Sequence, residues 1–122
     1  MAILTIATDV SIDANSTTFA VNGVAASAIT AGMACYINAS GLVAPCNNTH
    51  TFVGFAVKSA AAGRPVTLFR MAKIANYSAA MIPGAKLYQA GAGNEGKLSD
   101  APIVGTDPAV AIVVSTEDII VA

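Results

Sequence analysis

The sequence VKSAAAGRPVTL, at residues 57–68, reads as the end of a strand, a turn and the start of another strand. Gly63 can supply the positive φ of a tight turn. The turn is nonetheless apolar, because Ala60, Ala61 and Ala62 stand where polar side chains are usual. Small residues let another backbone approach closely, so two interpretations stay open. The turn holds three methyl groups in water, or it packs against a neighbouring subunit or another protein surface.

Short apolar segments continue on both sides of this stretch, separated by Gly, Pro and Asn. Regular short strands with such turn residues between them are typical of an all-β fold. Two helix candidates, at 24–31 and 78–81, are only one or two turns long and can equally be bends. The predicted strands are residues 3–8, 17–22, 34–38, 42–45, 52–58, 66–71, 85–90, 97–99, 109–114 and 118–121.

The sequence repeats itself weakly. Sliding the chain along itself places Gly32 and Tyr36 on Gly84 and Tyr88, with the same spacing in both copies. Later segments also match after insertions at turns, where insertions are tolerated. We therefore expect a small β-barrel or β-sandwich made of two pseudo-repeated halves. The expected single β domain covers residues 15–122, and its halves cover 24–69 and 76–122.

The first 14 residues lie outside this repeat. Residues 3–8, ILTIAT, are β-prone, and a segment rich in Asp, Ser and Asn follows them. An extended arm of this kind can add a strand to the exposed sheet edge of a partner. A strand of the domain itself is the alternative. We expect an N-terminal arm or edge strand at residues 1–14.

Charged residues form 11% of the 122-residue chain, 55% are apolar and the net charge is −1. Nucleic-acid binding is not expected, because phosphates need clustered Lys and Arg. A membrane helix is not expected either, since no run approaches roughly 18 apolar residues, and no basic segment of a secretory signal is present. Apolar surface can instead be covered in subunit interfaces, whose cores are poor in charge. We expect an oligomer or a partner-bound protein.

Two cysteines are too few for a disulfide framework. If residues 38–41 turn a hairpin with Ala39 and Ser40 at its tip, Cys35 faces Ala44 and not Cys46. We therefore expect two free thiols.

Motifs for catalysis or cofactors are weak. Residues 91–96 match G-x-G-x-x-G, but no helical pattern follows, which a dinucleotide site requires. His50 is the only histidine, and no metal-binding or nucleophile motif surrounds it. The adjacent acids Glu117 and Asp118 have no partner pattern across a substrate. We expect no enzyme activity, no cofactor, no metal site and no catalytic residue.

Three segments together resemble the small capsid decoration, or cement, proteins of tailed bacteriophages. They are AGMACYINASGLVAP at 31–45, TFVGFAVKSAAAGRPVTL at 51–68 and ILTIATDVSID at 3–13. The shared pattern is a Gly before a strand, a Gly turn, an A/V-G-x-A strand, a small-residue turn of the AAAG-x-P-V type and an apolar strand. Here its positions are Gly32, Gly41, the segments 53–56 and 60–66, and Leu68. His50, the cysteines and the 91–96 loop depart from the pattern.

The resemblance implies an all-β protein that binds the outside of an assembled phage head, after synthesis in the host bacterial cytoplasm. Such a protein bridges neighbouring copies of the major capsid protein, commonly as a homotrimer, without catalysis. Another virion-surface β-module, such as a spike, a fibre or a carbohydrate-binding domain, is the alternative. The expected capsid or subunit contacts are Ile3, Leu4, Thr5, Ile6, Ala60, Ala61, Ala62, Gly63 and Arg64.

Overall fold

The structure is a computed structural model that describes residues 3–7, 10–12 and 19–121. The described residues form strands and turns and contain no helix, which confirms the all-β prediction. The strands are β1 (Ser11–Ile12), β2 (Phe19–Val24), β3 (Ala34–Ile37), β4 (Val43–Pro45), β5 (Gly54–Ala56), β6 (Pro65–Arg70), β7 (Lys73–Ala75), β8 (Lys86–Gln89), β9 (Leu98–Ser99), β10 (Ala109–Val113) and β11 (Ile119–Val121).

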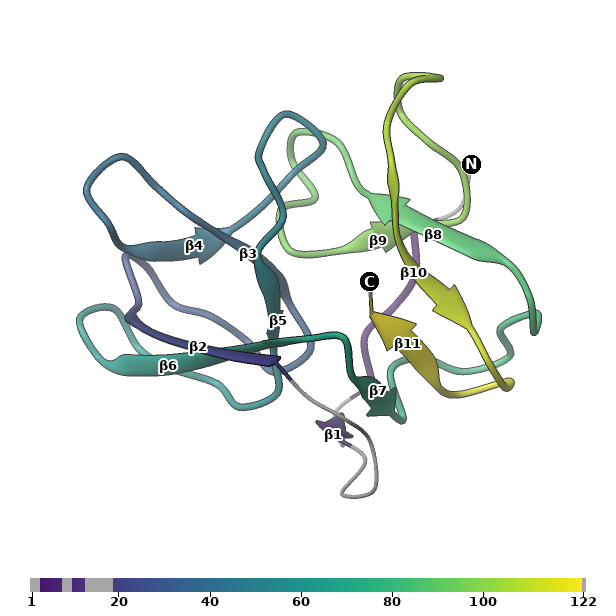
Figure 1. Ribbon diagram of the computed structural model, residues 1–122, viewed down its shortest axis with the longest axis horizontal. Coiled ribbons are helices and arrows are strands. Elements are labelled where there is room, and N and C mark those ends of the chain that lie inside the picture. The colour runs from purple at the N-terminus through teal and green to yellow at the C-terminus, as the bar shows by residue number, and fades with distance from the viewer. Residues whose placement is uncertain (1–2, 8–9, 13–18, 122) are drawn as a thin grey trace.

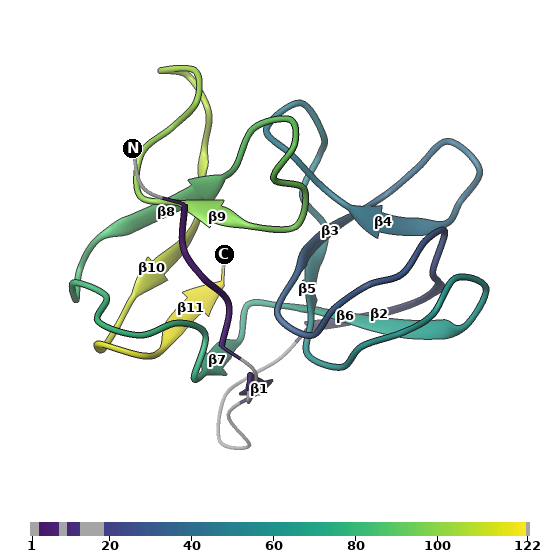
Figure 2. The same cartoon turned by 180° about the vertical axis from the view of Figure 1, so that it is seen from behind.

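The strands form two antiparallel sheets that lie side by side as two lobes (Figures 1 and 2). Sheet A has the order β1-β7-β11-β10-β8-β9, and sheet B has the order β2-β6-β5-β3-β4. Neither sheet closes into a barrel, although an isolated bridge between Ala25 and Val43 brings the two edges of sheet B together at one point.

The two sheets share one strand order. Sheet B contains β6-β5-β3-β4, and sheet A contains β11-β10-β8-β9, so each of the two predicted halves contributes four strands in the same arrangement. Backbone hydrogen bonds match as well. The Gly32 N–H donates to the Ala56 carbonyl (2.6 Å), and the Gly84 N–H donates to the Val113 carbonyl (2.7 Å). This correspondence makes Phe55 in β5 the structural equivalent of Ile112 in β10.

The local structure adds to and differs from the sequence prediction at several places. The segments 24–31 and 78–81, left open between short helices and bends, contain no helix and follow the bend alternative. Residues 3–7 of the predicted 3–8 strand are extended but form only one isolated bridge, from Ile3 to Ser99. The short strands β1 and β7 were not predicted, because β7 follows Met71 at a positive φ of 53° and begins with a charged residue.

The β3–β4 hairpin is one residue out of the predicted register. Cys35 faces Pro45 and not Ala44. The cause is the Asn38 carboxamide, whose Oδ1 accepts the backbone N–H groups of Ser40 and Leu42, at 3.0 Å each. Together with a positive φ at residue 41, these bonds give a loop of three residues instead of two, which is the other common hairpin form.

The inner faces of the two halves have separate cores. In the first half, Ala25, Ile29, Cys35, Val43, Ala56, Val66 and Leu68 are buried together. In the second half, the buried set includes the equivalent Tyr77, Met81, Leu87, Leu98, Val113 and Ile119. Burying a large apolar side chain stabilises a fold by about 1.5–3 kcal/mol, so each half has a substantial core of its own.

Phe55 joins the halves. Its side chain leaves the first sheet on the face opposite the first core and packs edge-to-face on Tyr77, with ring centroids 5.8 Å apart. Ala34 and Cys46 enter the same cluster. Backbone bonds support the contact, because the Ala34 N–H donates to the Gly96 carbonyl and the Gly96 N–H to the Cys46 carbonyl, both at 2.8 Å. The outer face of the first half is therefore covered by the second half.

Both cysteines are free and buried, in agreement with the prediction of two thiols. Burial raises the pKa of Cys35 and of Cys46 to about 12. The nucleophilic thiolate is then scarce near neutral pH.

We predict that the folded protein resists Ellman's reagent at pH 8, because both thiols are buried and protonated. A Ser40→Cys variant, with its new thiol on the exposed hairpin tip, should react with one equivalent at once. Both native thiols should react after denaturation. Rapid labelling of Cys35 or Cys46 in the native protein would show that the cores are more open than the structure indicates.

Candidate interaction surfaces

Residues 3–7 lie along the second half as an extended segment. The Leu4 N–H donates to the Leu98 carbonyl (2.9 Å), and the Ala7 N–H donates to the Tyr77 carbonyl (2.8 Å). Leu4 and Ile6 pack against the core, whereas Thr5 is exposed. Of the predicted contact residues in this segment, Leu4 and Ile6 are partly buried against the core and also line a hollow beside the segment. Ile3 and Thr5 line shallow hollows on both sides of it.

The Ile6 side chain also depends on Gly32. A Cβ added to Gly32 would lie 2.3 Å from Ile6 Cγ2, and Gly32 has a φ of +94°. The absence of a side chain at residue 32 therefore makes room for the N-terminal segment.

The apolar turn at residues 60–64 lies at the far end of the first half (Figure 1). Ala60 exchanges two backbone hydrogen bonds with Ile29, at 2.8 and 2.9 Å. The Gly63 N–H donates to the Ala25 carbonyl (2.8 Å), and the Ala25 N–H donates to the Arg64 carbonyl (2.9 Å). These hydrogen bonds brace the turn on the segment that follows β2. Gly63 has a φ of +82°, as the third residue of a type II turn requires. Ala61 and Ala62 remain exposed on this braced turn.

The two predicted contact segments are not brought together. Residues 3–6 border sheet A, and residues 60–64 cap the outer end of sheet B (Figures 1 and 2). A hollow of about 400 Å³ lies beside the turn and is lined by Ala60 of the turn and by the flanking residues Ser59 and Pro65. The chain thus presents two separate surfaces at these segments.

A third surface, the outer face of sheet A, was not predicted from the sequence. Ile112 pairs directly with Ile120, and both are about half exposed, at 47% and 46%. Lys86 pairs with Ile112 at one end of this row, and Lys73 pairs with Ile120 at the other end. The sequence does contain a sign of this surface. Strands with one face in solvent normally alternate apolar and polar residues, whereas AVAIVV at 109–114 and DIIVA at 118–122 are apolar at nearly every position.

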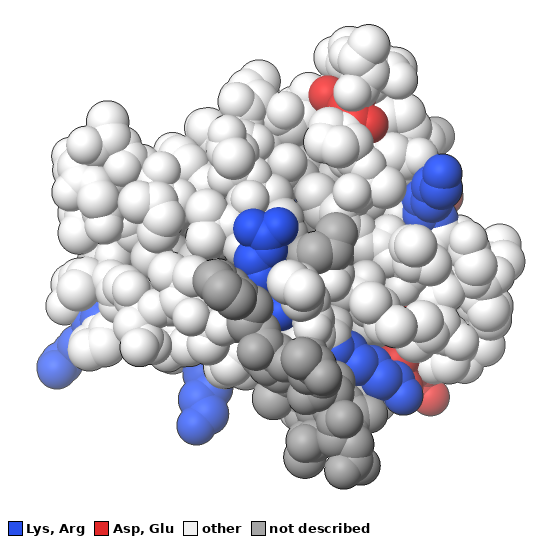
Figure 3. All heavy atoms as spheres, in the orientation of Figure 1, with Lys and Arg blue, Asp and Glu red and all other residues white. Residues whose placement is uncertain are grey.

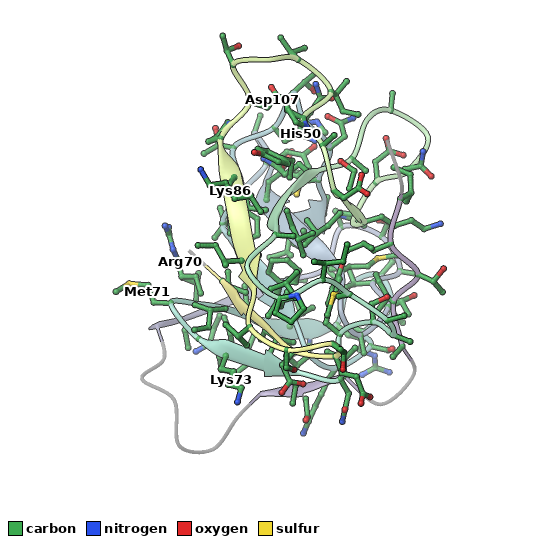
Figure 4. All side chains as sticks on the ribbon, turned by 90° about the vertical axis from the view of Figure 1, so that its right-hand side faces the viewer. His50, Arg70, Met71, Lys73, Lys86 and Asp107 are labelled. Atoms are coloured by element: carbon green, nitrogen blue, oxygen red, sulfur yellow. The ribbon has the colours of Figure 1, made fainter. Side chains whose placement is uncertain are left out.

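Figure 3 shows this face of the molecule, on which few charged side chains interrupt the uncharged surface. Lys73 and Lys86 are labelled in Figure 4, where they mark the two ends of the row. Lys73 lies 3.8 Å from Asp118. A small apolar hollow of about 130 Å³ opens between Lys86, Ile112 and Ile120.

His50 lies near the top of the view in Figure 4. Its ring stacks on Tyr36 with centroids 3.8 Å apart, and its Nδ1 accepts the Asn47 N–H (3.1 Å). His50 borders a cleft of about 330 Å³ that also includes Arg70 and Gln89. The Gln89 amide donates to the His50 carbonyl (3.3 Å), while Gln89 Oε1 and Arg70 Nε are buried without a partner among the described residues.

The neighbouring G-x-G-x-x-G loop is a turn held by Glu95. Its carboxylate accepts the Asn47 side-chain amide (3.2 Å) and the Gly93 N–H (2.9 Å). These hydrogen bonds, first that of Asn47 and then that of Gly93, lower the pKa of Glu95. Within the described part of the chain, no three metal-ligating side chains cluster. Nor do residues 3–7, 10–12 and 19–121 form a helix able to cross a membrane.

No family model matches the chain, and no curated protein matches its sequence.

We predict that Gly32→Ala destabilises the protein more than Gly63→Ala does. Both changes place alanine at a positive φ, which costs about 1–2 kcal/mol, but Gly63 has open space around it. Gly32→Ala also displaces Ile6, which should add about 1 kcal/mol or more. Urea unfolding of the two variants measures the difference, and equal losses of stability would mean that residue 6 does not pack on Gly32.

We predict that the Gly93 amide resonance titrates with a midpoint below pH 4.5, the ordinary pKa of Glu95. The lowered pKa makes the Glu95 contacts stabilising above pH 4.5, and they are lost as the pH falls through the folded pKa. Glu95→Gln should abolish this titration step, whereas Glu117→Gln should leave it unchanged. A midpoint at or above pH 4.5 would contradict the assigned hydrogen bonds.

Proposed function

We propose that this chain is a structural virion protein. It binds the outer surface of an assembled phage capsid and stabilises the capsid by bridging neighbouring copies of the major capsid protein. The observation that carries the proposal is the 60–64 turn, which is exposed and apolar at Ala61 and Ala62 yet braced on the segment around Ala25 and Ile29. A braced turn loses little conformational freedom on binding, and this reduces the cost of association.

Two contact surfaces suit a bridging role. The turn lies at the end of sheet B, and Ile3 and Thr5 border hollows beside sheet A. A rigid body with contacts at two separate places can hold two neighbours at once. The low charge of the chain favours binding through uncharged surface, and the segments that resemble phage decoration proteins include both the turn and residues 3–6.

Stabilisation of the capsid follows from mass action. A ligand that binds the assembled shell and not its separate subunits lowers the free energy of the shell. Each copy has a modest interface, but many copies add their contributions over one lattice. We propose that the protein acts as a homo-oligomer, with a trimer favoured, on the exterior of the virion.

We predict that phage heads lacking this protein gain additional density on their outer surface when incubated with it, as seen by cryo-electron microscopy. Heads saturated with the protein should also resist heat or chelator treatment longer than bare heads. A bare outer shell at a saturating protein concentration would refute the proposed function.

The turn is tested with a matched pair of variants. Ala62→Asp places a charge on the braced turn and should weaken binding to heads by at least about tenfold, as loss of one interface anchor does. Ala92→Asp makes the same change on another exposed loop and should bind like the unmodified protein. Equal binding of both variants would remove the turn from the contact surface.

A further inference from the structure

The cleft beside His50 is built by both halves of the molecule. Its walls come from the 48–52 loop and Arg70 of the first half, and from Gln89 and residues 108–110 of the second half. Its volume of about 330 Å³ is at the small end of the range for ligand sites, which often lie between domains. A space of this size admits a small molecule or the end of a chain.

Arg70 has no acidic partner in this cleft. It is the only Lys, Arg, Asp or Glu among the residues that line the cleft, and no carboxylate within the described part of the chain forms an ion pair with it. The Asp107 carboxylate accepts the Val104 N–H (3.0 Å) and the Asn48 side-chain amide (3.4 Å) instead. In Figure 4, Arg70 projects to the left, well below Asp107. The cleft therefore has one positive charge that its own residues do not neutralise.

Gln89 supplies a second incomplete group. Its side chain is 6% exposed, and its amide donates to the His50 carbonyl at 3.3 Å, which is a long hydrogen bond. Gln89 Oε1 has no donor and Arg70 Nε has no acceptor among the described residues, although both atoms are buried. Buried polar atoms without partners cost free energy. A ligand that offers an acceptor to Arg70 and a donor to Gln89 satisfies both, once the two side chains turn toward it.

The rest of the lining favours an aliphatic group. One wall is apolar and consists of Phe52, Pro108, Ala109 and Val110. Such a wall suits an aliphatic side chain. Aromatic stacking on a ligand is restricted, because Tyr36 already covers one face of the His50 ring and Phe55 packs edge-to-face on Phe52. These contacts favour the end of a peptide over a sugar ring.

We propose that this cleft binds the C-terminal residue of a partner polypeptide. The terminal carboxylate accepts hydrogen bonds from the Arg70 guanidinium, and the N–H of the same residue donates to Gln89 Oε1. The aliphatic side chain of that residue lies on the apolar wall. Arginine–carboxylate bonds are strong and geometrically specific, and capture of a C-terminal carboxylate is a recurring mode of peptide recognition. This site is independent of the proposed capsid function, since purified protein and peptide suffice to test it.

An NMR titration of the ¹⁵N-labelled protein with N-acetyl-alanyl-valine tests the site. The Gln89 side-chain amide signal should shift and saturate, with a Kd of about 1 mM or less. The same dipeptide ending in a carboxamide lacks the negative charge and should bind at least about tenfold more weakly. Equal binding of the acid and the amide, or no saturable shift up to about 10 mM acid, would overturn the proposal.

A matched pair of variants tests the role of Arg70. Arg70→Gln should weaken binding of the acid by at least about tenfold and leave binding of the amide unchanged. Lys86→Gln removes a cation from the same side of the molecule (Figure 4) but outside the cleft, and it should bind like the unmodified protein. Equal losses in both variants would reduce the effect to general charge attraction and refute the site.

Two further measurements complete the test. Thermal unfolding shows whether Arg70→Gln is folded. If it is not, Arg70→Lys keeps the charge but loses the planar pair of donors, and it should bind the acid more weakly than the unmodified protein. Glucuronate, an acidic sugar, should bind more weakly than the dipeptide acid. Tighter binding of glucuronate in the same cleft would assign the site to a carbohydrate and overturn the peptide proposal.

Discussion

The packing of Phe55 on Tyr77 is the contact on which the rest of the structure depends. Each half has its own core beneath four strands, but the core of the second half is completed by Ala34, Cys46 and Phe55 from the first. Backbone hydrogen bonds at Gly96 fix the same contact at the level of the main chain. Phe55 of the first half therefore fills part of the core of the second half, and this shared packing joins the two sheets into a single body.

This arrangement also determines where the surface is apolar. Two similar halves joined head to tail bury the outer face of the first and leave the outer face of the second open, at Ile112 and Ile120. The exposed turn at residues 60–64 and the N-terminal segment are two further surfaces, both anchored to the fold through backbone hydrogen bonds. The proposed role of covering and joining neighbouring proteins uses these uncharged surfaces.

Much of the fold was predictable because the local signals agreed with it. Gly63, the Pro- and Asn-containing turns and the β-branched segments placed most strands within one or two residues. The spacing of Gly32 and Tyr36 against Gly84 and Tyr88 indicated the repeat. The hairpin register was missed because the Asn38 side chain, not the backbone pattern, sets its loop length. The strand β7 was missed because it begins with the charged Lys73 directly after the turn at Met71.

The surfaces were less predictable than the strands. Phe55 and Ile112 are both apolar residues within apolar strands, so the sequence does not distinguish the buried one from the exposed one. That difference arises only from how one half covers the other. The turn at 60–64 was found because three alanines are unusual at a bend, but its bracing on Ala25 and Ile29 depends on contacts distant in sequence.

Native-state hydrogen exchange under increasing urea is the most direct test of the claim that the two halves fold and unfold as a single body. The amides to follow are those of Leu68 in β6 and Ile119 in β11, which occupy equivalent positions in the two halves. Their opening free energies should converge on one value, because the halves unfold together when they share a core. Two separate values, differing by more than about 1 kcal/mol up to global unfolding, would show that the halves are independent and that the Phe55 contact does not unite them.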